Sequence, residues 1–273
     1  MVKLILGILT VVIYSPVFWA LYKSEWAQRD YTHAYFILPV AVFIVWTRRR
    51  LIGEAMREGK DCFAPAGLAM TQGLGVLIFG LLMFIFGWRQ EYLIFQTLSF
   101  IFVLWGMVRF VYGPRVTRIL RFPIFYLLLL VPLPTGVLDN ITLPMRYGVS
   151  VVSAGILNLM QYPITRAGLL LTVGSQEIYM GEPCSGFRSL IAMVSLGLVY
   201  IYFVGGSRKK SLILAAALVP MALLGNLIRV VAMCLVTYHF GAEVGQGFYH
   251  YASGAVVFVV MVVGLMGLER ALR

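Results

Sequence analysis

A cysteine in the stretch GEPCSGFRSL, residues 181–190, is the first side chain whose setting suggests chemistry. Cys184 directly follows a proline, which suits the first position of a helix, so we expect Cys184 in a first helical turn. Free backbone N–H groups and the positive end of the helix dipole favour an anion there, and the thiolate is the nucleophilic form of cysteine. Glu182 and Arg188 flank it, and Ser185 is more simply a hydrogen-bonding residue of the helix end. The alternative is a small buried cysteine that only packs well.

The stretch LLGNLIRVVAMCLV places two polar residues, Asn226 and Arg229, inside an apolar run. They are three residues apart and therefore share one face of a helix. An arginine within a membrane span is costly and is by default a functional hypothesis. If the helix enters the membrane near Ser211, a rise of 1.5 Å per residue brings Arg229 about 27 Å across, near the opposite boundary. The alternative is that Arg229 only extends its guanidinium to the lipid headgroups.

His250, in the stretch GFYHYASGAVVFVV, stands at the start of the last apolar run. Histidine titrates near neutral pH and can act as a base or an acid, although a single interfacial histidine is more often structural. Cys184, Arg229 and His250 belong to three different apolar runs, yet they project to one depth and one face of the membrane. This coincidence favours a shared functional site over three separate structural roles. His239 is the second candidate for the base.

Other kinds of site find little support in the sequence. Cys62, Cys184 and Cys234 are too few and too scattered for a disulfide framework, and none has a partner at metal-ligand spacing. We therefore expect no metal ion and no organic cofactor. The GxSxG motif of serine hydrolases is absent. The net charge of +11 comes from short basic clusters between apolar runs, so we expect no nucleic-acid partner.

The elements that would position these residues are membrane helices. With 61% hydrophobic and 12% charged residues, the chain is far from a soluble average, and helices are the natural way to cross lipid. We predict an all-α integral membrane protein with residues 1–273 forming a single polytopic domain. The predicted spans number eight and cover residues 3–22, 34–47, 66–88, 92–112, 122–138, 187–206, 211–238 and 249–268.

Basic residues set the predicted orientation of these spans. The segments RRRLIGEAMREGKDC, GPRVTRILR and SRKK and the tail ERALR all fall on one side of the membrane. That side is cytoplasmic by the positive-inside rule, and it holds about 15 of the 22 basic residues. Both termini are therefore expected in the cytoplasm.

A long segment, residues 139–186, is then expected outside, as a roof before the cysteine. Its first part, residues 139–163, is apolar enough for an interfacial or a re-entrant helix, and a membrane-spanning arrangement stays open. Further on, LLLTV and EIYM flank Gly174 and Ser175, which predicts a hairpin with a two-residue turn. Elsewhere, glycines such as Gly73, Gly80 and Gly254 lie where small residues let helices approach closely.

The motifs CSGFRSL, NLIRV and YHYASG, in this order and at these spacings, resemble the exosortase/archaeosortase family. The likeness extends upstream to THAYFILP and LVPLPTGVLDNITLPM and so covers most of the chain. The family pattern often has a small residue before the cysteine, where this chain has Pro183, and the subfamily stays open.

The resemblance implies a membrane-embedded cysteine protease or transpeptidase, and the histidine favours the bacterial branch. The family's proposed Cys, Arg and His fall on Cys184, Arg229 and His250. Its substrates are exported proteins with a C-terminal sorting tail, made of a short motif such as Pro-Glu-Pro, a transmembrane helix and a basic cluster. The implied place is the plasma (inner) membrane, in contact with the lipid bilayer, with the site facing the periplasm or exterior.

The mechanism that we predict runs through a thioester on Cys184. Arg229, aided by Asn226 and amides near Ser185, would stabilise the oxyanion, and His250 would protonate the leaving amine. The sequence leaves open whether an amine, a lipid or water accepts the acyl group. It also leaves open the sorting motif, the substrate-binding residues and the oligomeric state.

Two other classes of function remain. The first is a polytopic transporter in which Arg229 and His250 line a path for an anionic solute. This class accounts for the arginine and the histidine, but it leaves Cys184 at a helix mouth unexplained. The second is a non-catalytic scaffold in the cell envelope, in which all three polar residues could be replaced with little loss.

Overall fold

The chain folds mostly into helices. A computed structural model describes residues 2–24, 26, 31, 33–61, 66–180, 187–246 and 248–272. These form two compact units, Met1–Pro134 and Thr135–Arg273. In the part described, four helices are long and apolar enough to cross a membrane: Leu4–Lys23, Thr71–Arg89, Leu93–Leu130 and Arg208–Phe240. The eight spans and the cytoplasmic termini stay predictions, as does the single polytopic domain.

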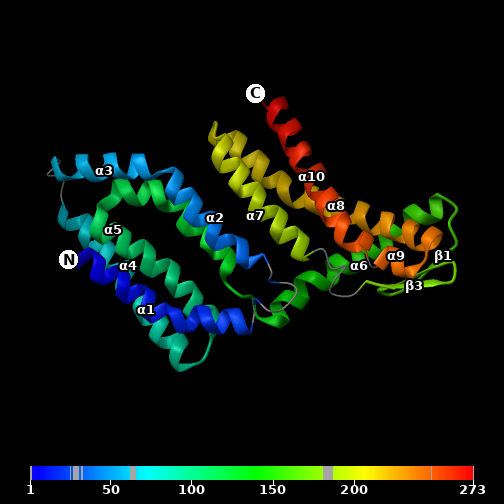
Figure 1. The fold of residues 1–273 in the computed structure, drawn as a ribbon, viewed down its shortest axis with the longest axis horizontal. Coiled ribbons are helices and arrows are strands. Elements are labelled where there is room, and N and C mark those ends of the chain that lie inside the picture. Colours follow the sequence, from blue (N-terminus) through cyan, green and yellow to red (C-terminus); the bar gives the residue numbers. More distant parts are fainter. Residues whose placement is uncertain are drawn as a thin grey trace. The chain divides into compact units, whose positions relative to one another are not determined.

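The first unit is a bundle of helices (Figure 1). The predicted ranges 3–22, 34–47 and 66–88 coincide with the helices α1, α2 and α4 to within a residue or two. Tyr14 of α1 and Ser99 of α5 share a hydrogen bond of 2.8 Å, which joins these two helices. The elements of the unit are α1 (Val2–Lys23), α2 (Ala34–Thr47), α3 (Arg49–Asp61), α4 (Ala66–Arg89), α5 (Leu93–Tyr126) and the 3₁₀ helix η2 (Leu127–Leu130).

The basic segments of this unit are helical rather than loops. Residues 49–61 form the amphipathic helix α3, which buries Ile52 and exposes Leu51. Residues 113–121 belong to α5, which turns sharply at Gly113, where φ is 79°. Pro114 follows as a suitable first residue of the continuing helix, and the hydroxyl of Thr117 donates to the Gly113 carbonyl at 2.8 Å. The predicted connection between two spans is therefore a helical corner.

The predicted span 122–138 is not one helix. It comprises the end of α5, the 3₁₀ helix η2, and the first residues of α6 (Thr135–Leu159). Two prolines, Pro132 and Pro134, stand between η2 and α6. Because proline lacks the N–H that a continuing helix needs, the chain leaves the helical path here.

In its described residues, the second unit combines helices with a small sheet (Figure 1). Strands β1 (Ile164–Ala167), β2 (Leu170–Val173) and β3 (Gln176–Tyr179) pair antiparallel in the order β1-β2-β3. Val173 pairs with Gln176 across the turn, so the predicted two-residue turn at Gly174 and Ser175 is confirmed. The helices that follow are α7 (Phe187–Val204), α8 (Arg208–Phe240), α9 (Ala242–Gln246) and α10 (Phe248–Ala271).

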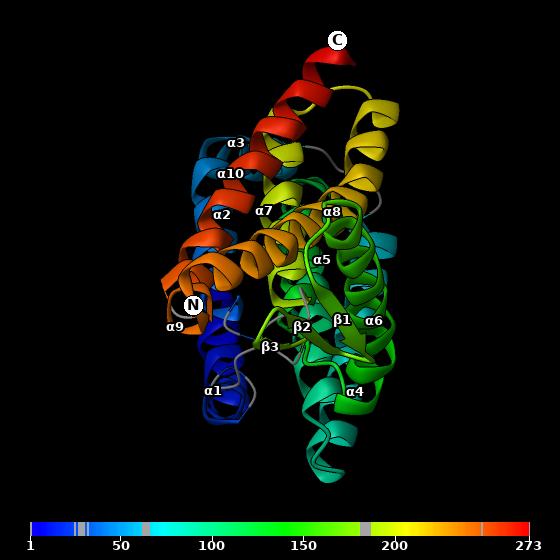
Figure 2. The same ribbon diagram turned by 90° about the vertical axis from the view of Figure 1, so that its right-hand side faces the viewer.

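The helix α8 passes through two separate cores. Its first half packs with α7 and α10, which lie side by side with it in Figure 1. We call this core the three-helix cluster; its buried residues are Met193, Ile201, Leu214, Leu218, Ala222, Met261 and Leu265. The second half packs with α6 and the sheet, and the sheet lies beneath α8 in Figure 2. We call this core the sheet cluster; its buried residues are Val149, Leu157, Ile164, Leu171, Val173, Ile178, Met180, Val230, Met233 and Cys234.

An ion pair fixes the antiparallel arrangement of α8 and α10. The Nζ of Lys210, at the start of α8, lies 2.5 Å from the Oε1 of Glu269, near the end of α10. The helix α7 also packs antiparallel to α8, since only a short turn joins them and Gly197 contacts Leu218. Both α7 and α10 therefore begin towards the end of the unit where α8 finishes.

Candidate functional site

Asn226 and Arg229 lie where α8 changes from one core to the other. Ala222 is the last α8 residue in the three-helix cluster, and Val230 is the first buried one in the sheet cluster. Asn226 is only 3% exposed, and its Oδ1 has no hydrogen-bond partner in the structure. Arg229 is partly buried. The predicted pair therefore stands inside the protein, with an amide acceptor still available.

Several predicted site residues lie outside the described part of the chain. Cys184, Ser185 and Glu182 belong to residues 181–186, which connect β3 to α7. Arg188 and His250 lie in the first turns of α7 and α10, and only their helical backbone is described. Since these two helices begin towards the end where α8 finishes, the backbone arrangement is compatible with the predicted site. The contact among Cys184, Arg229 and His250 stays a prediction.

The second candidate for the base, His239, belongs to an exposed aromatic cluster at the end of α8. Its Nε2 lies 3.2 Å from the Oη of Tyr162, and the rings of Tyr162 and Tyr238 meet it edge-on at 5.8 and 5.0 Å. A Cβ on Gly174 would come within 3.0 Å of the Tyr238 ring, so the sheet turn packs against this cluster. These contacts hold the His239 ring against two tyrosines, and its candidacy as the base stays a prediction.

Cys234 is fully buried in the sheet cluster. Its surroundings are apolar residues of α6, α8 and the sheet, which confirms the predicted packing role. Cys62 lies outside the described residues. Within the described residues, no group of three or more His, Cys, Asp or Glu side chains is placed to hold a metal ion.

The helix α6 contributes polar residues that the sequence analysis did not single out. Thr142 and Ser153 are at most 1% exposed, and their hydroxyls have no hydrogen-bond partner in the structure. Arg146 is partly buried, and its Nε is shielded from solvent without a partner. Spacings of four and seven residues between these positions would have indicated a shared helix face.

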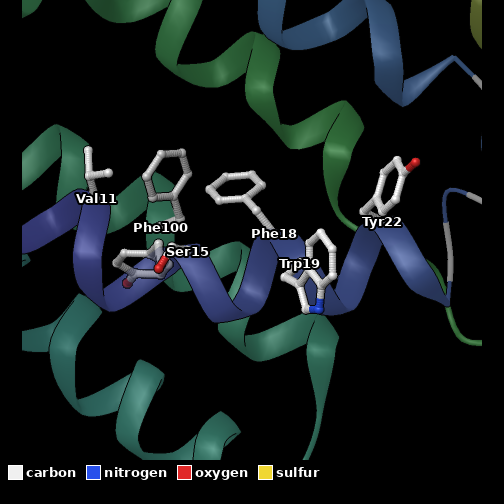
Figure 3. A pocket seen from close by; sticks show the side chains of 7 residues that line it. Val11, Ser15, Phe18, Trp19, Tyr22 and Phe100 are labelled. Carbon is white, nitrogen blue, oxygen red and sulfur yellow. The ribbon is translucent and has the colours of Figure 1, made fainter.

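The first unit contains an apolar cavity, unlike the polar surroundings of Asn226 and Arg229. It has a volume of about 550 Å³ and is open to the surroundings, between α1 and α5 (Figure 3). Phe18 and Phe100 meet edge-on inside it, with ring centroids 5.1 Å apart. Its lining is almost wholly apolar and aromatic: Val11, Tyr14, Ser15, Phe18, Trp19, Tyr22 and Phe100. Nothing in this lining resembles a nucleophile with its base, so we assign it no catalytic role.

The model of one protein family, described as transmembrane exosortase (Exosortase_EpsH), matches residues 26–267. This range covers most of the chain, and the chain belongs to this family. The family is membrane-embedded and resembles cysteine transpeptidases. No curated protein and no solved structure matches the chain. The family match gives no support to a transporter.

Proposed function

We propose that this exosortase-family protein is a cysteine protease or transpeptidase of the plasma (inner) membrane. It removes the C-terminal sorting tail of exported proteins, with Cys184 as nucleophile, Arg229 as oxyanion stabiliser and His250 as acid and base. The observation that carries the proposal is the pair on α8, a partly buried Arg229 beside a buried Asn226 with an unpaired acceptor. Polar groups kept inside a membrane protein in this way indicate a functional site.

The reaction needs a single nucleophile and one group that moves a proton. The Cys184 thiolate attacks the carbonyl carbon of the scissile peptide bond, and Arg229 stabilises the negative charge that develops on the oxygen. The C–N bond breaks while the imidazolium of His250 gives its proton to the leaving amine. His250 then takes a proton from the acceptor, an amine or water, which attacks the thioester and releases the thiolate.

The proposal includes an orientation. With eight spans and both termini in the cytoplasm, Cys184 and His250 would face the periplasm or exterior, where exported substrates arrive. The ion pair between Lys210 and Glu269 supports this orientation, because it joins the basic turn before α8 to the end of α10. Both segments belong to the basic set that is expected in the cytoplasm. The basic cluster of a substrate tail would lie on the same side.

The test is co-expression with a tail-bearing exported protein, followed by mass measurement of the tail. We expect wild type and Cys234→Ala to release the tail, and Cys184→Ala to release none. Cys234→Ala is the matched control, because it removes a buried thiol of the sheet cluster. Arg229→Gln should slow release by about 100-fold or more, as the loss of an oxyanion donor does.

Two results would reject the proposed chemistry. The first is equal processing by wild type and Cys184→Ala, which excludes a thioester on that residue. The second concerns hydroxylamine, which cleaves thioesters and should release the substrate as a hydroxamate. Failure to obtain this product from an actively processing wild-type protein would exclude the covalent intermediate.

A further inference from the structure

Arg146 is partly buried and lies in the middle of a buried face of α6. At 100° per residue, this face spans an arc of about 100°. Its other members are at most 9% exposed: Thr142, Val149, Ser150, Ser153 and Leu157. The guanidinium is thus carried by the helix face that packs inward, and its Nε is shielded from solvent without a partner.

Two of the three hydroxyls on this face, those of Thr142 and Ser153, differ from other helix hydroxyls, whereas Ser150 donates to the Tyr147 carbonyl at 2.9 Å. Thr10, Thr97 and Thr117 each donate to the carbonyl four residues earlier, at 2.8 Å. Helix geometry offers the same bond to Thr142 and Ser153, yet both hydroxyls are buried and unpaired. A buried polar group without a partner costs free energy unless a ligand supplies the partner.

The facing side of α8 repeats the pattern. Asn226 and Thr237 are at most 3% exposed, and each keeps an oxygen without a hydrogen-bond partner in the structure. They share a face of α8 with Val230 and Met233, which pack with α6 residues in the sheet cluster. We call the two facing polar sides, with Thr142, Arg146 and Ser153 on α6 and Asn226 and Thr237 on α8, the α6–α8 seam.

Guanidinium and hydroxyl groups in one seam match an acidic peptide. Arginine binds carboxylates through paired, charge-assisted hydrogen bonds. Hydroxyls and an amide suit the N–H and C=O groups of an extended backbone, which needs partners away from water. Among the residues that the structure describes, no acidic side chain lies on the buried face of α6 or on the seam of α8. An acidic side chain of a bound peptide would supply the carboxylate.

We propose that the α6–α8 seam binds the segment of the substrate that precedes its tail helix, and that Arg146 holds an acidic side chain of this segment. The inference rests on the proposed function, because it assumes a peptide substrate. Asn226 belongs both to the seam and to the surroundings of Arg229. The seam therefore leads the bound peptide toward the residues proposed to cleave it. Arg146 is a residue for substrate specificity rather than for chemistry.

The test measures binding without cleavage. The full chain with Cys184→Ala is placed in nanodiscs of zwitterionic lipid. Two fluorescent peptides are compared: the substrate's motif segment with its tail helix, and the same peptide with each acidic residue changed to its amide. We expect the acidic peptide to bind about 10- to 100-fold more tightly, as hydrogen bonds to a charged group allow. Arg146→Gln should abolish this difference, and Arg146→Lys should keep part of it.

Arg166→Gln is the matched control. Arg166 belongs to the same unit, but it is exposed, donates to the Gly168 carbonyl at 3.0 Å and lies 4.9 Å from the centre of the Tyr147 ring. Its loss should leave the preference for the acidic peptide unchanged. Retained binding of the amide peptide by Arg146→Gln shows that the variant is folded.

Three outcomes would overturn the inference: equal losses in Arg146→Gln and Arg166→Gln, equal weakening of both peptides by Arg146→Gln, or binding of neither peptide. The proposed function fails separately. If wild type does not cleave the substrate while Arg146 still selects the acidic peptide, only the proposed chemistry is wrong. If wild type cleaves and Arg146 makes no difference, only the seam is wrong.

Discussion

Replacing Gly73 by alanine tests how closely α4 and α5 must approach. A Cβ on Gly73 would lie 2.7 Å from the backbone N and 2.9 Å from the Cα of Phe110. Ordinary Cβ contacts begin near 3.4 Å, so the helices must separate locally by about 0.7 Å. The atoms met are backbone atoms, which cannot rotate away as a side chain could.

The expected cost follows from that separation. A gap of 0.5–1 Å forfeits about a quarter to a half of the dispersion energy between the atoms on either side. Overpacking of this kind costs about 1–3 kcal/mol. We therefore expect Gly73→Ala to lower the free energy of unfolding by about 2 kcal/mol. Gly106→Ala should cost at least as much, because its Cβ would come within 2.5 Å of the Leu77 backbone N.

The matched control is Gly75→Ala, two residues along the same helix. Gly75 is exposed, and a Cβ there would meet nothing within 4 Å. Only helix propensity changes, and alanine gains up to about 1 kcal/mol over glycine. SDS titration in mixed micelles, followed by the fluorescence of Trp88 and Trp105, measures the difference. Equal stability of Gly73→Ala and Gly75→Ala would refute the close approach of α4 and α5.

Two further predictions concern the second unit. Lys210→Met should destabilise the protein by about 3–5 kcal/mol, because it removes the ammonium group that pairs with the Glu269 carboxylate, whose side chain is 5% exposed. Adding Glu269→Leu should recover most of this loss in the same SDS titration, and no recovery would contradict a buried pair. Gly174→Ala should speed hydrogen exchange in β2 and β3 more than Gly168→Ala does. Both glycines have φ near +60°, but only at Gly174 would a Cβ meet the Tyr238 ring; equal effects would show that backbone strain alone decides.

The lengths of the apolar runs and the glycine and proline residues between them made much of the fold predictable. The range 34–47 is a helix with the predicted bounds, and Gly174 with Ser175 forms the predicted turn. Gly73 and Gly80 do sit at close helix contacts, whereas a Cβ at Gly254 would meet no atom of the described residues within 4 Å. A glycine in an apolar run thus indicates a contact only when the partner helix happens to lie opposite.

The segments between predicted spans hold more regular structure than the sequence indicates. Charge marks the end of an apolar run, so the basic stretches 48–62 and 113–121 are predicted only as connections. Amphipathic helices carry that charge without breaking, and a glycine with positive φ can turn the chain within one residue. The strand β1 was missed because its four residues have no alternation of their own; it forms by pairing with β2.

The α6–α8 seam was hidden for a different reason. Serine and threonine are common in membrane helices, where they normally bond to their own backbone, so their presence signals little. Only the structure shows that Thr142, Ser153 and Thr237 leave that bond unmade. In the sequence, Arg146 is one more charged residue of a segment that is expected outside. Its burial depends on which face of α6 packs inward, and the sequence alone does not give that face. The sequence predicts the polar pair Asn226 and Arg229 on α8, but it does not predict the polar residues of α6 that belong to the same seam.

Two independent cores meeting on one helix also explain why polar groups can persist at Asn226. The three-helix cluster ends at Ala222 and the sheet cluster begins around Val230, so neither core has to close around the amide. An apolar side chain at position 226 would need packing partners from both cores. The helices that could supply them are already held in place by other contacts. Lys210 and Glu269 fix α8 and α10 at one end, and Tyr238 and Gly174 fix α8 and the sheet at the other. The junction can then keep its polar groups while the rest of α8 remains packed in the two cores.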